Sequence, residues 1–148
     1  MKIYLFICLF IPITILSQNA EKIKKADTIY VFFKRDKNQF FEKNNRIELG
    51  NLNYNYIFRI NETSQSFMTF VHHYRLTPEE RRERKSFLKK NKDIIITYDF
   101  LTKYNLGEAT ELIGHKKKVY LIDKEDISWF SIKLLEVKVI GTWKQSIE

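Results

Sequence analysis

Two neighbouring segments of alternating character constrain the fold more than any other feature of the chain. From residue 54 to residue 60 ("YNYIFRI"), every second residue is Tyr, Phe or Ile, and Asn, Ile and Arg lie between them. Because successive side chains of a strand point to opposite faces, this alternation predicts a strand with one buried and one wet face. The turn-forming "NETSQ" (61–65) and the apolar-rich "SFMTFVHHYRL" (66–76) follow. Together these segments predict a β-hairpin.

Further strands are predicted on both sides of the hairpin. Runs of β-branched and aromatic residues predict strands at 28–34, 93–97 and 117–123. Uninterrupted apolar runs of this kind are typical of strands covered on both faces. A last strand is predicted from Trp129 to Gly141. Its apolar positions change parity between Leu134 and Leu135, which predicts a β-bulge or a sharp bend there.

The middle of the chain carries the helical signals. We expect an exposed charged helix at about 78–91, and one or two short helices at about 98–113. The residues from 35 to 46 are turn-rich. The order of strands, a central helical block and strands again predicts a single α+β domain over 28–148, with a mostly antiparallel sheet.

The first seventeen residues have the layout of a secretory signal peptide. Lys2 precedes an apolar run from Ile3 to Leu16, and Ser17 is the small residue before the expected cut. The run is shorter than the roughly 20 residues that a helix needs to span a bilayer. We therefore expect residues 1–17 to be cleaved, residues 18–27 to be a flexible lead-in, and the product to be periplasmic or extracellular.

Cys8 is the only cysteine, so a chain cut after Ser17 has none. Such a chain would form no disulfide, thiolate metal site or cysteine nucleophile. Ile7 precedes Cys8 and further apolar residues follow it, an arrangement that argues against lipid attachment. Removing 17 of the 148 residues leaves 131. A chain of this length buries roughly two-thirds of its unfolded surface, enough to fold without disulfides.

The chain is basic, with 26 Lys and Arg against 18 Asp and Glu and a net charge of +8, of which the cleavage removes only Lys2. A basic exported protein suits nucleic acid, anionic lipid or acidic polysaccharide. Lysine outnumbers arginine and Ile and Asn are frequent, as expected of a protein from an AT-rich bacterial genome. The charge alone therefore identifies no partner.

The stretch "TPEERRERKSFLKKNK" (77–92) predicts the exposed helix. Thr77 and Glu80 are spaced as a capping box, with Pro78 at the first helical position. All three Glu residues of the stretch lie near its start and three Lys residues (89, 90 and 92) lie near its end, in the order that the helix dipole favours. The charges are explained either by a helix that faces water or by a face that binds a polyanion. That face would consist of Arg81, Arg84, Lys85 and Lys89.

The histidines carry the case for catalysis. His72 lies on the apolar side of its strand and is predicted to be a buried, hydrogen-bonded core residue, whereas His73 points to the opposite, exposed face. Neighbouring strand residues do not bind one metal ion together, so no metal site is predicted. A ribonuclease-like site would combine His73 and His115 with a phosphate-binding lysine, Lys116 or Lys117. No motif in the sequence requires that arrangement.

The remaining motifs favour a binding function. The four glycines are isolated, which argues against a phosphate-binding loop, and the acidic turn "DKED" (123–126) lacks the spacing of a calcium loop and is predicted to lie on the surface. The sequence therefore favours a non-enzymatic binding or accessory domain of the bacterial envelope or extracellular space. Its expected partner is an anionic polymer or an acidic protein, and no cofactor is expected. The alternatives are a small ribonuclease-like hydrolase acting on a polyanion, and an inhibitor or immunity-type protein for an acidic partner.

Overall fold

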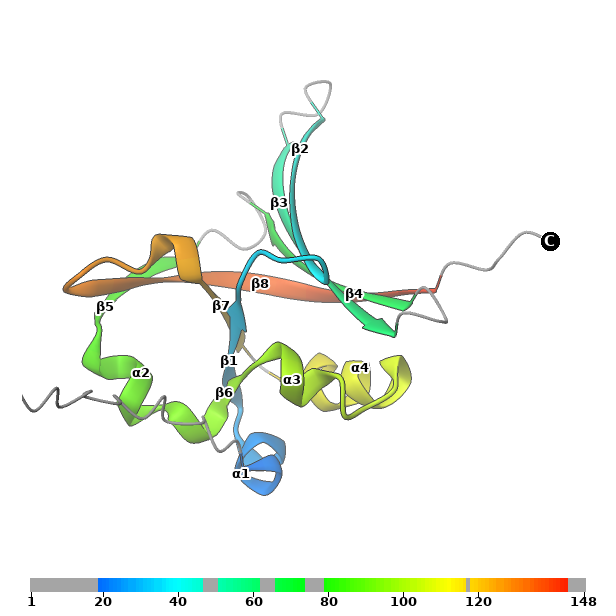
Figure 1. The fold of residues 1–148 in the computed structure, drawn as a ribbon, viewed down its shortest axis with the longest axis horizontal. Coiled ribbons are helices and arrows are strands. Elements are labelled where there is room, and N and C mark those ends of the chain that lie inside the picture. The colour runs from blue at the N-terminus through cyan, green and yellow to red at the C-terminus, as the bar shows by residue number, and fades with distance from the viewer. Residues whose placement is uncertain (1–18, 47–50, 62–65, 74–78, 117, 144–148) are drawn as a thin grey trace, which may run out of the picture.

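The computed structural model describes residues 19–46, 51–61, 66–73, 79–116 and 118–143. In them, eight strands form a mixed sheet in the order β2-β3-β4-β8-β7-β1-β6, and β5 pairs with β8 outside this path. The strands are β1 (Thr28–Phe33), β2 (Gln39–Arg46), β3 (Asn51–Asn61), β4 (Ser66–His73), β5 (Glu80–Arg84), β6 (Ile95–Ile96), β7 (Lys118–Asp123) and β8 (Ser131–Trp143). The helices are α1 (Ala20–Lys25), α2 (Ser86–Lys90), α3 (Tyr98–Leu101) and α4 (Leu106–Gly114), with 3-10 helices η2 (Lys92–Ile94) and η3 (Lys124–Asp126). The elements form one α+β body (Figure 1).

The longest strand, β8, joins the two halves of the sheet. Its residues 131–135 pair with β5 and its residues 138–143 pair with β4, both in antiparallel orientation. On its other edge, β7 pairs with residues 135–137. The strands β4 and β5 therefore follow one another along one edge of β8, as Figure 1 shows.

His72 fills the junction between β4 and β5. There the N–H of Glu136 donates to the carbonyl oxygen of Glu79 at 3.0 Å. The carbonyl oxygen of Glu136 lies 2.7 Å from Nδ1 of His72, whose side chain is only 2% exposed. Because a buried carbonyl group needs a donor, the imidazole takes the place of a backbone amide. The prediction of a buried, hydrogen-bonded His72 is confirmed.

Two of the strand pairings are parallel. β1 lies between β6 and β7 and runs parallel to both, in register from Thr28 with Lys118 onward. The five other pairings are antiparallel. The uninterrupted apolar sequence of β1 matches its position, because a strand with neighbours on both edges and cover on both faces exposes no side. The sheet is therefore mixed, with an antiparallel majority.

The exposed charged helix predicted at 78–91 is wrong. Residues 80–84 form β5, which pairs with residues 131–135 of β8, and only Ser86–Lys90 (α2) is helical. Differences in helix propensity amount to about 0.7 kcal/mol per residue or less, so a sheet edge that offers hydrogen bonds overrides them. The alternating Arg and Glu residues suit an edge strand, because charged side chains discourage pairing with further chains.

A capping box occurs at the start of α4. The side-chain oxygen of Asn105 accepts from the N–H of Glu108 at 2.9 Å, and the Glu108 carboxylate accepts from the N–H of Asn105 at 3.0 Å. The helices α3 and α4 occupy the stretch in which one or two short helices were expected. Thr77 and Pro78 lie outside the described residues.

The change of apolar parity at Leu134 and Leu135 does not come from a bulge. Both side chains are buried, and the pairing with β5 continues through them without a shift. Leu135 belongs to the larger hydrophobic core and Leu134 to a smaller one. Since neighbouring strand residues point to opposite faces, β8 is covered on both faces at this point. A register shift occurs elsewhere in the sheet, in the pairing of β3 with β4 between Arg59 and Asn61.

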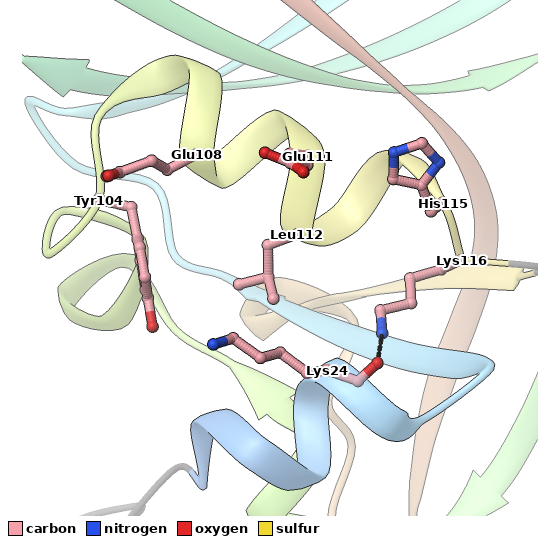
Figure 2. Close-up of a pocket in the computed structure, with 7 residues that line it drawn as sticks. All are labelled: Lys24, Tyr104, Glu108, Glu111, Leu112, His115 and Lys116. Carbon is pink, nitrogen blue, oxygen red and sulfur yellow. Dashed lines mark hydrogen bonds between the residues drawn. The ribbon is translucent and has the colours of Figure 1, made fainter.

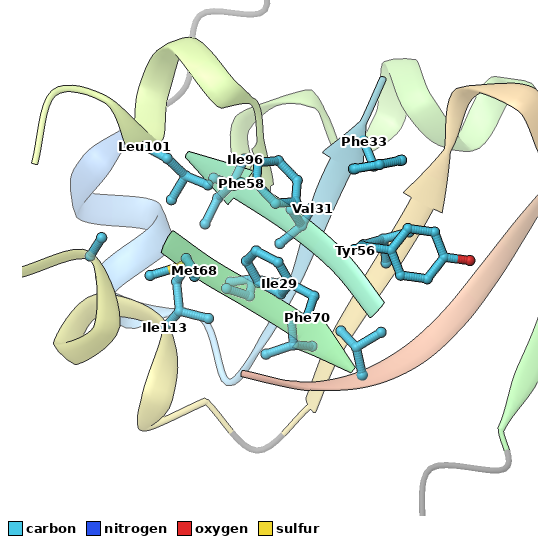
Figure 3. Packing of buried hydrophobic residues seen from close by; sticks show 14 of the residues in the cluster. Ile29, Val31, Phe33, Tyr56, Phe58, Met68, Phe70, Ile96, Leu101 and Ile113 are labelled. Carbon is cyan, nitrogen blue, oxygen red and sulfur yellow. The ribbon is translucent and has the colours of Figure 1, made fainter. Parts of the chain in front are cut away.

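The larger core is built on the predicted hairpin. β3 and β4 pair as expected, and Tyr56, Phe58 and Ile60 are buried, as the alternation indicated. β2 extends the hairpin, so strand replaces most of the turn-rich segment 35–46. Figure 3 shows side chains of the hairpin, β1 and the helices meeting in this core, among them Ile29, Val31, Phe58, Met68, Phe70, Leu101 and Ile113.

The helix α1 belongs to the same core. Ile23 is fully buried there, and the N-cap residue Asn19 accepts from the N–H of Lys22 at 3.1 Å. The Nζ of Lys116 donates to the carbonyl oxygens of Ile23 and, at 2.8 Å, of Lys24, at the C-terminal end of α1. The flexible lead-in predicted over 18–27 thus contains a docked helix.

The smaller core lies on the other face of the sheet and is covered by α2. Phe87 and Leu88 of α2 pack against it, and the Phe87 ring meets the Tyr30 ring edge-on at a centroid distance of 4.9 Å. The two apolar residues of α2 therefore serve to hold the helix against the sheet. The charged residues around them face solvent.

Candidate functional site

The predicted catalytic histidines do not meet in one cavity. His73 ends β4 opposite Asn53 and is half-buried, and it lines none of the three cavities described below. His115 is the exposed residue that follows α4 and lines the largest of them. Lys117 lies outside the described residues. The two histidines therefore share none of these cavities, although Lys116 lines the same cavity as His115, and the ribonuclease-like site stays a prediction.

The four predicted polyanion-binding residues do not share one face. Arg81 and Arg84 are three residues apart in β5, so their side chains point to opposite faces of the strand. Lys85 precedes α2, and Lys89 lies in its last turn. The Arg81 guanidinium lies 5.2 Å from the centre of the Tyr120 ring and pairs with Glu83 at 3.5 Å. The four residues therefore form no single helix face, because Arg81 and Arg84 belong to a strand, and polyanion binding by them stays a prediction.

The largest cavity, of about 500 Å³, is the seam between α1 and α4 (Figure 2). Its lining residues are Lys24, Tyr104, Glu108, Glu111, Leu112, His115 and Lys116. Two of the polar side chains already have structural roles, since Glu108 caps α4 and Lys116 caps α1. Burial lowers the pKa of Lys116. We regard this cavity as a packing seam between two helices.

A cavity of about 330 Å³ lies between α4 and the β7–β8 pair. Its polar residues include Lys118, which binds the Glu79 carboxylate, while the Tyr120 hydroxyl donates to the same carboxylate at 2.8 Å. These bonds lower the pKa of Glu79 and raise that of Lys118. The polar groups satisfy one another, so this cluster holds the start of β5 against β7.

A smaller cavity, of about 210 Å³, contains more unusual chemistry. It opens where the parallel strands β1 and β7 end, which brings Asp123, the last residue of β7, close to Arg35, which follows β1. We call it the Asp123 cavity. It is lined by Arg35, Phe41, Tyr54, Tyr56, Glu80, Asp123, Asp126, Lys133 and Leu135.

Asp123 lies at the base of this cavity. Its side chain is only 3% exposed, and one carboxylate oxygen accepts from the N–H of Glu125 at 3.0 Å. The other oxygen lies 3.4 Å from Nη2 of Arg35, a long contact for an ion pair, and the Arg35 side chain is half exposed. Burial raises the pKa of the Asp123 carboxyl, and the neighbouring Asp126 raises it further. The fold thus holds a carboxyl group whose charge it only partly compensates.

Aromatic side chains form one wall of the cavity. The Phe41 ring lies 5.1 Å from the Tyr56 ring and 5.9 Å from the Tyr54 ring, and the Arg35 guanidinium lies 4.6 Å above Phe41. Tyr56 is 4% exposed, and burial, with Asp123 second, raises the pKa of its hydroxyl. A protonated tyrosine therefore faces the same space as a buried carboxyl group.

A chain of charged groups forms the rim. Glu80 lies 3.3 Å from Nζ of Lys133 and 3.7 Å from Nε2 of His72. Since Nδ1 of His72 donates to the carbonyl of Glu136, a neutral His72 ring presents Nε2 as an acceptor, and a protonated ring presents a donor to Glu80. His72, predicted as a core residue, therefore also lies close to a residue that lines the cavity.

The sequence contains one signal for this site. Asp123 is both the last residue of the predicted strand 117–123 and the first acidic residue of the turn that follows, and the structure buries it while residues 124–126 (η3) are exposed. An acidic residue directly after the apolar run "VYLI" belongs to the end of a buried strand. Glu80 was assigned to the helix. Its place beside Lys133 depends on the pairing of β5 with β8, which no local pattern indicates.

The described residues contain no cluster of three or more His, Cys, Asp or Glu side chains arranged to hold a metal ion. They also contain no helix with the length and apolar character needed to cross a bilayer. No protein-family model, curated protein or solved structure matches this chain.

Proposed function

We propose that this protein is an exported, non-enzymatic binding domain that holds a small polar group in the Asp123 cavity. The observation that carries the proposal is the placement of the buried Asp123 carboxyl, partly compensated by Arg35, beside the Tyr56 hydroxyl in a cavity open to solvent. A buried polar group destabilises a protein unless it is well paired. A ligand that donates a hydrogen bond to Asp123 would supply the missing pairing.

The lining indicates the chemical class of the ligand. Amine and hydroxyl groups donate to carboxylates, and the rings of Phe41, Tyr54 and Tyr56 suit the apolar face of a sugar or a similar ring. A cavity of about 210 Å³ is small for a drug-sized ligand, so we infer a single amino sugar, a sugar residue of a longer polymer or an amine of comparable size.

Binding is tested by thermal denaturation of the protein with amino sugars, neutral sugars, short amines and acidic sugars. We expect the amine or sugar compounds to raise the melting temperature of the wild type, because a ligand that binds only the native state stabilises it. Asp123→Asn and Tyr56→Phe should abolish the effect. Glu111→Gln, in the seam between α1 and α4, is the matched control and should retain it. The proposal fails if the ligand effect survives Asp123→Asn.

Export is tested separately. The apolar run at residues 3–16 and the small Ser17 support cleavage, so a protein expressed in bacteria should be recovered outside the cytosol with Gln18 as its first residue. Fractionation followed by mass spectrometry of the N-terminus measures both properties. An intact chain starting at Met1 and confined to the cytosol would contradict this part of the proposal.

A hydrolase acting on a sugar polymer is the second candidate. It is favoured by the raised pKa of Asp123, which suits a general acid, and by the Glu80 carboxylate in the same cavity. Incubation with reducing-end assays on amino-sugar polymers distinguishes the two functions. Turnover that is lost in both Asp123→Asn and Glu80→Gln would favour the enzyme, and stoichiometric binding without turnover would favour the binding domain.

A further inference from the structure

Two large aromatic side chains stand side by side on the surface at the start of β8. Trp129 is 80% exposed and Phe130 is 78% exposed, and their ring centroids are 6.5 Å apart with an interplanar angle of 76°. They lie in the short connection between η3 and β8, at one end of the long strand (Figure 1). Exposed aromatic pairs of this size are unusual in a monomer and mark interaction sites.

The turn that carries the two rings is held by hydrogen bonds on both sides. The N–H of Ser128 donates to the carbonyl oxygen of Ser131 at 2.9 Å, and the N–H of Ser131 donates to the hydroxyl of Ser128 at 3.0 Å. The N–H of Lys85 donates to the carbonyl oxygen of Phe130 at 3.0 Å. Ile127, just before the turn, packs against the smaller core. The backbone is thus fixed on its inner side, and the two rings are presented outward.

Positive charges flank the aromatic turn. Arg84 pairs with Ser131, and Lys85 is bonded to Phe130 through its backbone. The side chains of Arg82, Arg84 and Lys85 are exposed and make no ion pair with another described side chain. The acidic groups nearby are Glu83, which pairs with Arg81, and the exposed Glu125 and Asp126 of η3.

We propose that the Trp129–Phe130 turn docks the protein onto an anionic lipid surface. Trp prefers the boundary between lipid headgroups and hydrocarbon, and nearby Arg and Lys residues are attracted to an anionic leaflet. A nucleic acid is the less suitable partner. Base stacking uses a flat ring platform along a groove, whereas these rings meet edge to face, and neither lines any of the three cavities described above.

The test places a single tryptophan at the proposed contact. The sequence has two tryptophans, Trp129 and Trp143, so Trp143→Phe leaves Trp129 as the only one. This variant, purified after export with its N-terminus determined by mass spectrometry, is mixed with phosphatidylcholine vesicles with or without phosphatidylglycerol. We expect a blue shift of Trp129 emission and quenching by brominated acyl chains only with the anionic vesicles. Because the signal reports on residue 129 alone, apolar residues 3–16 cannot mimic it.

Matched variants separate the aromatic from the electrostatic contribution. In sedimentation with anionic vesicles, we expect Trp129→Ala with Phe130→Ala to weaken binding by about tenfold or more, since both apolar contacts are lost. Ile140→Ala, at the 52% exposed residue near the other end of β8, should leave binding unchanged. Arg84→Glu with Lys85→Glu should weaken binding and remove its dependence on salt, whereas Lys37→Glu with Lys103→Glu, which changes the net charge equally, should have a smaller effect.

Far-UV circular dichroism establishes that each variant is folded. The proposal is overturned if Trp129 emission does not respond to anionic vesicles, or if the Trp129→Ala, Phe130→Ala variant binds them as well as the wild type. It is also overturned if the two rings instead mediate binding to single-stranded oligonucleotides, or dimerisation detected by analytical ultracentrifugation. Loss of ligand binding at the Asp123 cavity does not affect this result, because no residue substituted in these variants lines that cavity.

Discussion

Leu134 and Leu135 are neighbours in β8, yet their side chains enter two different hydrophobic cores on opposite faces of the sheet. We expect Leu134→Ala and Leu135→Ala each to lower the free energy of unfolding by about 2–5 kcal/mol, the range for a buried leucine. Urea denaturation measures both values. Ile140→Ala, at a half-exposed position of the same strand, should change the free energy of unfolding by less than about 0.5 kcal/mol. A neutral effect of either leucine variant would show that one face of β8 is open to solvent.

Ile23 tests whether α1 is part of the folded body. Its side chain is fully buried in the larger core, so Ile23→Ala should lower the free energy of unfolding by about 2–4 kcal/mol. Lys25→Ala, at an exposed position of the same helix, is the control and should be nearly neutral. If both variants unfold at the same urea concentration as the wild type, α1 does not pack against the core.

The hydrogen bond between His72 and the carbonyl of Glu136 should contribute to the free energy of unfolding independently of the volume of the side chain. His72→Phe keeps a ring of similar size but removes the donor, and a buried carbonyl without a partner destabilises a protein by about 1–3 kcal/mol. Chemical denaturation of this variant should show that loss. The same change at the exposed His115 should stay within about 0.5 kcal/mol of the wild type.

Asp123→Asn should stabilise the protein near neutral pH. Because burial raises the pKa of Asp123 above its ordinary value of 3.8, the native state binds a proton more readily than the unfolded state. The wild type therefore loses stability as the pH rises from about 3.8 through the raised pKa. Removing the charge should raise the melting temperature at pH 7 by on the order of 3 °C, as about 1 kcal/mol would in a domain of this size.

The increase in melting temperature from Asp123→Asn should vanish below pH 3.8, where the wild-type carboxyl is neutral in both the native and the unfolded state. The asparagine side chain can still accept the hydrogen bond from the N–H of Glu125. Melting curves at several pH values measure the difference. A variant that is less stable than the wild type at pH 7 would mean that the Arg35 ion pair outweighs the burial of the charge.

Glu79 should show the opposite pH dependence. Its bonds to Lys118 and to the Tyr120 hydroxyl lower its pKa from 4.5, so its contribution is fully present above that value and is lost as the pH falls through the lowered pKa. Glu79→Gln should therefore lower the melting temperature at pH 7 but not at strongly acidic pH. Tyr120→Phe, which removes one of the two bonds, should lower the melting temperature at pH 7 by less than Glu79→Gln does. A pH-independent effect would contradict the ion-pair interpretation.

The parts of the fold that depend on local patterns were predictable. Alternation located the β3–β4 hairpin, and the uninterrupted apolar run of residues 28–33 indicated a strand covered on both faces. In contrast, residues 80–84 carry good helix formers after an apparent capping box, and their pairing with β8 is a contact between segments about fifty residues apart in the chain. A local rule does not detect such a contact.

The candidate site was less predictable than the fold, for the same reason. The Asp123 cavity combines the ends of β1 and β7 with residues of β2, β3, β5 and β8, so it exists only once the sheet is assembled. Its aromatic residues could be assigned to a buried face from their alternation. The presence of a carboxyl group beside these residues was not predictable from the local sequence. It follows from the parallel register of β1 and β7, which brings Asp123 opposite Phe33 and next to Arg35.

The position of β8 has a consequence for the order of folding. This strand contributes to both cores and pairs with β4, β5 and β7, so neither half of the sheet is complete before the last described strand has been synthesised. Contacts between distant segments also form slowly. During synthesis, the sheet can therefore be completed only after β8 has emerged from the ribosome.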